Sequence, residues 1–65
     1  MRSGYYAYIP RGDGTEPMGT DRKIIRWDLK TDAGMVRHVR KYLGPTARVF
    51  AFRSFYDDST FRQIV

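Results

Sequence analysis

The sequence has no cysteine and only one histidine. Without cysteine the chain can form neither disulfides nor thiolate metal sites, and a cysteine nucleophile is excluded. No apolar run approaches the length of a membrane span, and Met1–Tyr5 is not followed by the apolar stretch of a signal peptide. We therefore expect a cytoplasmic protein with no membrane partner, stabilised by packing or association rather than by covalent or metal staples.

Residues suited to catalysis are few. His38 lies between Arg37 and Arg40, beside an apolar stripe and apart from any identifiable serine and acid, which favours a structural role. The pair Asp57 and Asp58, followed by a serine, is typical of a turn, and no second acidic cluster completes a magnesium site. The sequence therefore predicts no catalytic residues, no metal site and no cofactor, and hence a protein that is not an enzyme.

Positive charge is concentrated in one part of the chain. The net charge is +5, yet residues 33–56 contain five basic residues and no Asp or Glu, while the basic and acidic residues elsewhere cancel. Such a stretch would attract a polyanion or an acidic protein surface. The alternative is that Lys and Arg near the end of a helix complement its dipole and keep a small protein soluble.

Turn-forming residues and periodicity divide the chain into four strands, one helix and one long loop within a single domain, residues 1–65. Thr31 or Asp32 can cap a helix that Gly44 and Pro45 terminate, and its apolar stripe includes Met35, Val39 and Tyr42. The predicted elements are a strand over 4–9, a long loop over 10–22, a strand over 23–29, a helix over 32–43, and strands over 47–56 and 60–65.

This order predicts a small α+β fold. We expect a single-layer antiparallel or mixed sheet of three to four strands, in ββαββ order, with one helix packed on one face. Ile25, Trp27 and Leu29 alternate onto one side of their strand, and Trp27 is expected to join the core under the helix.

Both faces of the sheet are apolar in the sequence. In the third strand, residues 48, 50, 52, 54 and 56 form one alternating set and residues 49, 51, 53 and 55 the other, and both sets contain aromatic residues. In the first strand, Tyr6 and Tyr8 oppose Tyr5, Ala7 and Ile9. One short helix covers only one sheet face, so the other face is expected to bind a partner or to form a homodimer.

Residues 48–55, Arg-Val-Phe-Ala-Phe-Arg-Ser-Phe, resemble the RNP1 strand motif of RNA-recognition motifs. The shared features are the basic first position, aromatic residues at the third, fifth and eighth positions, and the small residue between the first two of them. The segment departs from the motif at Val49, where RNP1 has glycine, and at Arg53, where it has an aliphatic residue. Only one helix is predicted where that fold has two. The resemblance implies similar chemistry rather than membership of the family.

Two functions from different classes follow. The first is a nucleic-acid-binding module that neutralises phosphates with arginines and stacks bases on aromatic rings. The second is a protein-binding adaptor or inhibitor, of the size that phages and other mobile elements encode. It would dock on a larger host protein that binds nucleic acid, and an acidic target site there would explain the basic stretch equally well. For either function the candidate binding residues are Arg37, Arg40, Lys41, Arg48 and Arg53, with Phe50, Phe52, Tyr56, Tyr6 and Tyr8.

Overall fold

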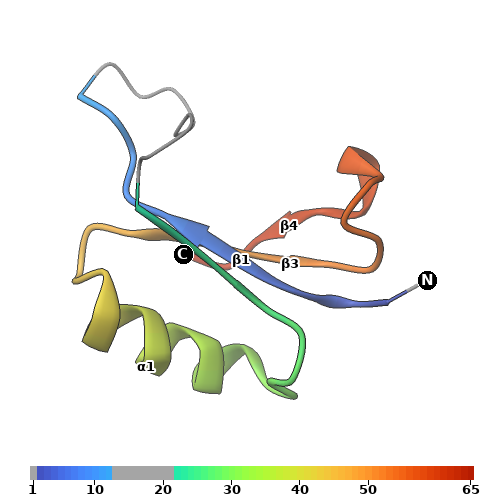
Figure 1. Ribbon diagram of the computed structural model, residues 1–65, viewed down its shortest axis with the longest axis horizontal. Helices are drawn as coiled ribbons and strands as arrows, with labels where there is room; N and C mark the ends of the chain where they lie inside the picture. Colours follow the sequence, from blue (N-terminus) through green and yellow to red (C-terminus); the bar gives the residue numbers. More distant parts are fainter. Residues whose placement is uncertain (1, 13–21) are drawn as a thin grey trace.

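The first strand lies in the middle of the sheet. The computed structural model describes residues 2–12 and 22–65. In chain order their elements are β1 (Gly4–Tyr8), β2 (Lys23–Arg26), α1 (Asp32–Tyr42), β3 (Arg48–Phe52), the 3₁₀ helix η1 (Asp58–Thr60) and β4 (Arg62–Gln63). The strands pair antiparallel in the order β2-β1-β3-β4, and α1 packs on one face (Figure 1). The predicted α+β class, one helix on a four-stranded sheet, is confirmed, with η1 as an added element between the last two strands.

All four strands are shorter than the sequence predicts. The longest difference is in β3, which ends at Phe52 because the chain then turns away from the sheet. The Ser54 amide donates to Thr60 Oγ1 at 3.1 Å, and this hydroxyl lies 2.9 Å from the Ser54 carbonyl oxygen. Side-chain bonds of this kind compete with ladder hydrogen bonds and favour turns. The predicted loop over 10–22 falls largely on residues 13–21, which lie outside the described residues.

Local signals define the ends of α1. The Thr31 hydroxyl accepts from the Gly34 amide at 3.1 Å, which satisfies one of the unpaired donors of the first turn. The helix ends at Tyr42, and Gly44 has a φ of 94°, a left-handed conformation that favours glycine. The predicted helix over 32–43 is thus one residue too long. Tyr42 does not pack into the core as expected, because its side chain is 52% exposed.

The main core lies between α1 and one face of the sheet. Met35 and Val39 are fully buried, as predicted. They belong to one cluster with residues from β1, β3 and the segment between α1 and β3: Tyr5, Ala7, Leu43, Ala47 and Val49. Residues paired across an antiparallel ladder share a face, so Ala7 and Val49, which are paired, both face the helix. The odd-numbered residues of β1 and β3 therefore face α1 and the main core.

The segment between β3 and β4 folds back over the other face. Its Phe55 and Phe61 rings lie 5.5 and 5.0 Å from the Phe52 ring, between centroids. In Figure 1, η1 and α1 lie on opposite sides of the sheet. This cover reduces the apolar surface on which a homodimer was predicted, without removing it.

Trp27 belongs to this second cluster rather than to the core under the helix. Its ring lies edge-on against Phe52, with centroids 5.3 Å apart, and 36% of the residue is exposed. The prediction failed because β2 ends at Arg26 and the chain bends at residues 27–28, so Leu29 packs against the helix core while Trp27 does not. A Cβ at Gly4 would lie 2.9 Å from the Phe52 ring and 2.7 Å from the Arg26 carbonyl oxygen. Glycine at this position therefore allows both groups to approach the β1 backbone closely.

Candidate functional site

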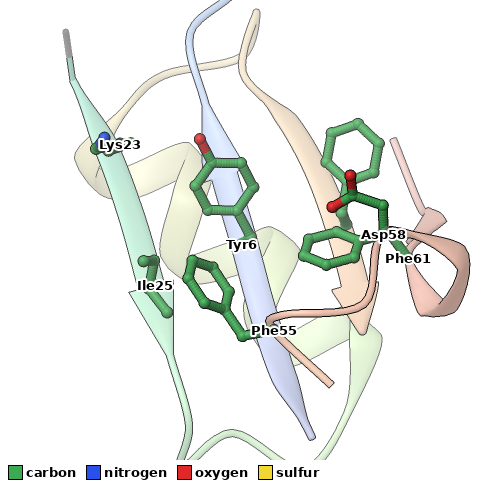
Figure 2. Close-up of a pocket in the computed structure, with 7 residues that line it drawn as sticks. Tyr6, Lys23, Ile25, Phe55, Asp58 and Phe61 are labelled. Atoms are coloured by element: carbon green, nitrogen blue, oxygen red, sulfur yellow. The ribbon is translucent and has the colours of Figure 1, made fainter. Parts of the chain in front are cut away.

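A groove of about 390 Å³ opens on the sheet face opposite α1. We call it the aromatic groove, and Figure 2 shows its lining residues: Tyr6, Lys23, Ile25, Phe50, Phe55, Asp58 and Phe61. The strands supply its floor and the segment between β3 and β4 supplies one wall. Four of the seven lining residues are aromatic, so the groove suits a flat, unsaturated ligand.

The register of the sheet produces the floor. Tyr6 pairs with Ile25 of β2 and with Phe50 of β3, so these three side chains lie in one row across adjacent strands. The Phe55 and Phe61 rings each approach the Tyr6 ring to 6.4 Å between centroids, at interplanar angles of 67° and 79°. Edge-to-face contacts of this kind hold the wall against the floor.

A hydrogen-bonded turn fixes the wall. Thr60 Oγ1 lies 2.8 Å from the Asp57 carbonyl oxygen, and the Asp57 carboxylate accepts from the amide and the hydroxyl of Ser59 at 3.1 and 2.7 Å. Together with the contacts of Ser54 described above, these bonds tie both ends of the turn. The groove is therefore largely preformed, which lowers the entropy that a ligand must lose on binding.

Charged groups occupy two sides of the groove. Tyr8 pairs with Lys23 on one side and with Arg48 on the other, so these cations lie in the row next to Tyr6 and Phe50. Neither Lys23 nor Arg48 makes an ion pair within the described part of the chain. The Asp58 carboxylate lies on the opposite wall, beside Phe61 (Figure 2). The groove thus has a basic side and one acidic group facing it.

Only two of the predicted aromatic site residues line the groove. Tyr6 and Phe50 do so, whereas Phe52 and Tyr8 are each 3% exposed and cannot stack on a ligand. Tyr56 is 94% exposed and lies outside the groove lining. Of the aromatic positions shared with RNP1, the third lines the floor, the fifth is buried beneath the wall, and the eighth, Phe55, forms part of the wall.

The five predicted basic residues do not form one surface. Arg37, Arg40 and Lys41 are exposed on α1, on the other side of the sheet from the groove, and we call these three the helix cations. Arg53 lines a separate cavity with Trp27 and Arg62. Only Arg48 shares a face with the groove, because it stands two residues before Phe50 in the same strand.

Sequence reasoning missed five lining residues. Lys23 and Ile25 could have been found, because they alternate with Ile24 and pair with Tyr8 and Tyr6. Phe55 is the eighth position of the RNP1 resemblance, whereas Asp58 and Phe61 gave no signal. All three lie beyond the end of β3, where strand periodicity no longer places side chains. They reach the groove through the hydrogen-bonded turn.

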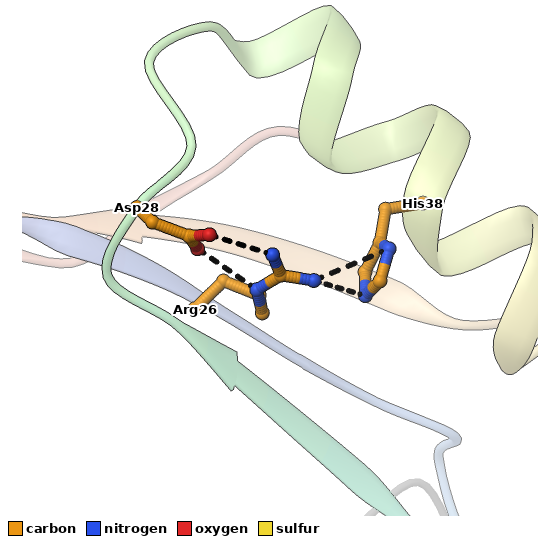
Figure 3. Close-up of polar contacts among 3 residues, drawn as sticks. All are labelled: Arg26, Asp28 and His38. Carbon is orange, nitrogen blue, oxygen red and sulfur yellow. Dashed lines mark hydrogen bonds and ion pairs between the residues drawn. The ribbon is translucent and has the colours of Figure 1, made fainter.

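His38 takes part in a polar cluster on the helix side of the sheet (Figure 3). Arg26 donates to His38 Nε2 at 2.9 Å and to both carboxylate oxygens of Asp28 at 2.9 and 2.8 Å. The hydrogen bond from Arg26 lowers the pKa of Asp28. The hydrogen bond between Arg26 and His38 ties β2 to α1.

A second polar cluster links α1 to β1 and β4. The Tyr5 hydroxyl donates to Asp32 Oδ1 at 2.9 Å, and Arg62 donates to Asp32 Oδ2 at 3.2 Å. The hydrogen bond from Arg62, followed by that from Tyr5, lowers the pKa of Asp32. Burial, reinforced by the bond to Asp32, raises the pKa of Tyr5. Both shifts favour an ionised Asp32 and a protonated Tyr5 at neutral pH, the states in which Asp32 accepts hydrogen bonds and Tyr5 donates one.

The Asp32 cluster should make stability depend on pH. The lowered pKa of Asp32 means that its contribution is present above the unfolded value of 3.8 and is lost as the pH falls through the folded value. Asp32→Asn is expected to lower the urea midpoint at neutral pH. In this variant the midpoint should also fall less steeply below about pH 5 than in the unchanged protein. Urea titrations at several pH values would measure both. Asp58→Asn is the control, because that carboxylate makes no ion pair among the described residues, and an equal flattening there would contradict the assignment.

The described residues contain neither a candidate metal site nor a candidate membrane-spanning helix. Among residues 2–12 and 22–65, no three His, Asp or Glu side chains are grouped so as to hold a metal ion. No helix in the same ranges has the length and apolar character needed to cross a bilayer. Neither a family model, nor a curated protein, nor a solved structure matches the chain.

Proposed function

We propose that the protein binds single-stranded nucleic acid in the aromatic groove. The observation that supports this proposal is the juxtaposition of two partly exposed rings, Tyr6 and Phe50, with the cations Lys23 and Arg48 on one sheet face. Neither cation makes an ion pair among residues 2–12 and 22–65. Unpaired bases expose their faces for stacking on aromatic side chains, whereas bases inside a duplex do not. A single strand therefore matches this surface better than a duplex does.

The two cations would contact phosphates. Lys23 and Arg48 belong to strands on either side of β1, so their backbones are about 10 Å apart, twice the spacing between neighbouring strands. Their row lies next to the row of Tyr6 and Phe50. A strand that crosses the sheet can thus lay its backbone over the cations while a base enters the groove. Phosphate binding of this kind weakens with salt because bound counterions are released.

Salt dependence tests this arrangement. Each phosphate contact contributes about 0.7 to the slope of log affinity against log salt for a single strand, so Lys23→Gln with Arg48→Gln should lower the slope by about 1.4. Fluorescence anisotropy with short labelled strands at several salt concentrations measures it. The matched control replaces two helix cations, Arg37→Gln and Lys41→Gln, which removes the same charge from the other side of the sheet.

Three outcomes separate the possibilities. A lower slope for the sheet pair alone supports the groove as the binding site. An equal decrease in the slope for the helix pair would show that the nucleic-acid strand lies along α1, and the proposed site would be wrong. No binding of DNA or RNA below about 100 μM at low salt would exclude the function, because even non-specific binders reach about 10⁻⁴ to 10⁻⁶ M.

A second candidate function is docking on an acidic protein surface through α1. The observation that favours it is that the helix cations Arg37, Arg40 and Lys41 are all exposed on the side away from the groove. None of them makes an ion pair with an acidic residue in the part of the chain that the structure describes. Such a surface can steer and orient an acidic partner. Affinity capture with and without nuclease distinguishes the two functions. A partner that persists after nuclease treatment and is lost when the helix cations become Gln would support this candidate.

A further inference from the structure

Asp58 is an unexpected lining residue for a phosphate-binding groove. The chain carries a net charge of +5, and a carboxylate beside a phosphate site repels its ligand. Asp58 nevertheless faces the groove and makes no side-chain hydrogen bond or ion pair within the described ranges. Its position therefore favours a hydrogen-bond donor on the ligand rather than a phosphate.

We propose that Asp58 reads the base in the groove and that the site prefers guanine. This inference rests on the proposed function, because it needs a nucleic-acid base on Tyr6 and Phe50. An ionised carboxylate has only acceptors, and it can accept two parallel hydrogen bonds. Guanine presents two adjacent donors, its ring N–H and its amino group, on the edge used for base pairing. Adenine and cytosine present one amino donor beside an acceptor, and thymine and uracil one ring N–H between two carbonyl oxygens.

The turn gives its two aspartates different tasks. The Asp57 carboxylate is occupied by the amide and hydroxyl of Ser59, so it stabilises η1. Asp58, the first residue of η1, instead lies in the groove wall beside Phe61 (Figure 2). The turn is tied at Ser54 and Thr60, so the backbone that carries Asp58 is held beside the groove before the ligand arrives.

The two charged sides of the groove set the ligand's orientation. In Figure 2, Lys23 extends from β2 on one side and Asp58 lies on the other, with Tyr6 between them. A nucleotide has its phosphate and its base-pairing edge at opposite ends, and therefore matches this charge pattern in one direction only. The phosphate faces Lys23, the ring stacks on the floor, and the base edge faces Asp58.

The test compares three purine bases that stack similarly. Short thymidine strands with a central guanine, adenine or hypoxanthine would be titrated by fluorescence anisotropy against the whole protein and two variants. We expect the guanine strand to bind about fivefold more tightly than the adenine strand, the lower end of the range for a bidentate base contact. Hypoxanthine, which keeps the ring N–H but lacks the amino group, should fall between them.

Asp58→Asn should reduce the preference for guanine over adenine to less than about twofold, because an amide offers a single acceptor atom. The matched control is Asp57→Asn, which removes the same charge from the same turn and keeps a residue that can cap it. Its preference for guanine should be unchanged.

Each result bears on the inference. A preference for guanine that depends on Asp58 but not on Asp57 supports it. Equal binding of guanine and adenine strands overturns it while leaving the proposed function intact. A uniform gain in affinity for all strands in Asp58→Asn, with the ratio unchanged, shows that the carboxylate only repels phosphate and also overturns it. Absence of binding to every strand removes both this inference and the proposed function.

Discussion

Met35→Ala is expected to leave a large fraction of the molecules unfolded at room temperature. Met35 is fully buried between α1 and the sheet, in contact with the cluster that includes Tyr5 and Val49. Truncating a buried methionine to alanine removes its burial and leaves a cavity, a loss of about 2–5 kcal/mol. Domains of this size rarely have more than about 3–5 kcal/mol of stability from one core. Urea denaturation followed by circular dichroism would measure the change.

Val36→Ala is the matched control for Met35→Ala. Val36 is the next residue of the same helix but is only half-buried, on the flank that carries Arg37 and Arg40. Alanine has the higher helix propensity, so the exposed part of this substitution is neutral or favourable. We expect Val36→Ala to lower the free energy of unfolding by well under half as much as Met35→Ala does. Comparable losses would mean that α1 packs on the sheet through a different face.

Phe50→Leu is expected to weaken the binding of single strands by about fivefold or more at every salt concentration. Phe50 lies in the groove floor next to Tyr6, and its ring is stacked on the Tyr8 ring at 5.8 Å with an interplanar angle of 7°. Leucine keeps an apolar side chain there but removes the aromatic face, and base–aromatic stacking contributes about 1–3 kcal/mol per base. The salt slope should not change, because no phosphate contact is lost. Anisotropy titrations give both quantities.

Tyr56→Leu removes an aromatic ring of the same domain from outside the groove. Tyr56 is 94% exposed, so the substitution should affect neither folding nor affinity for single strands. If Tyr56→Leu weakened binding as much as Phe50→Leu, the ligand would contact the outside of the turn, and the groove would lose its role.

The helix and the class of the fold could be predicted because their signals are local. Thr31 and Gly44 mark the two ends of α1 through capping and backbone conformation, and Met35 and Val39 repeat at helical spacing. Strand ends have no comparable signal in this chain. Aromatic and β-branched residues continue beyond Phe52, and only the hydrogen bonds between Ser54 and Thr60 show where β3 stops.

The candidate site was predicted less well because charge was counted along the chain rather than by sheet face. Arg40 and Arg48 are close in sequence, yet the sheet separates the helix cations from the face that carries Arg48. Alternation correctly grouped Phe50 with Arg48 and Tyr6 with Tyr8. It could not show that Phe55 and Phe61 would cover Phe52, because that contact depends on tertiary folding.

The central place of β1 in the sheet has a consequence for how the protein folds during synthesis. β1 pairs with β2, which is near it in the sequence, and also with β3, whose Phe52 lies opposite Gly4. Of the strands in the sheet, a nascent chain that ends before residue 48 contains only β1 and β2, and isolated two-stranded hairpins are marginally stable. Contacts between distant parts of a chain also slow folding, because a long loop must close first. The protein should therefore acquire its structure only once β3 has left the ribosome, in a single late step.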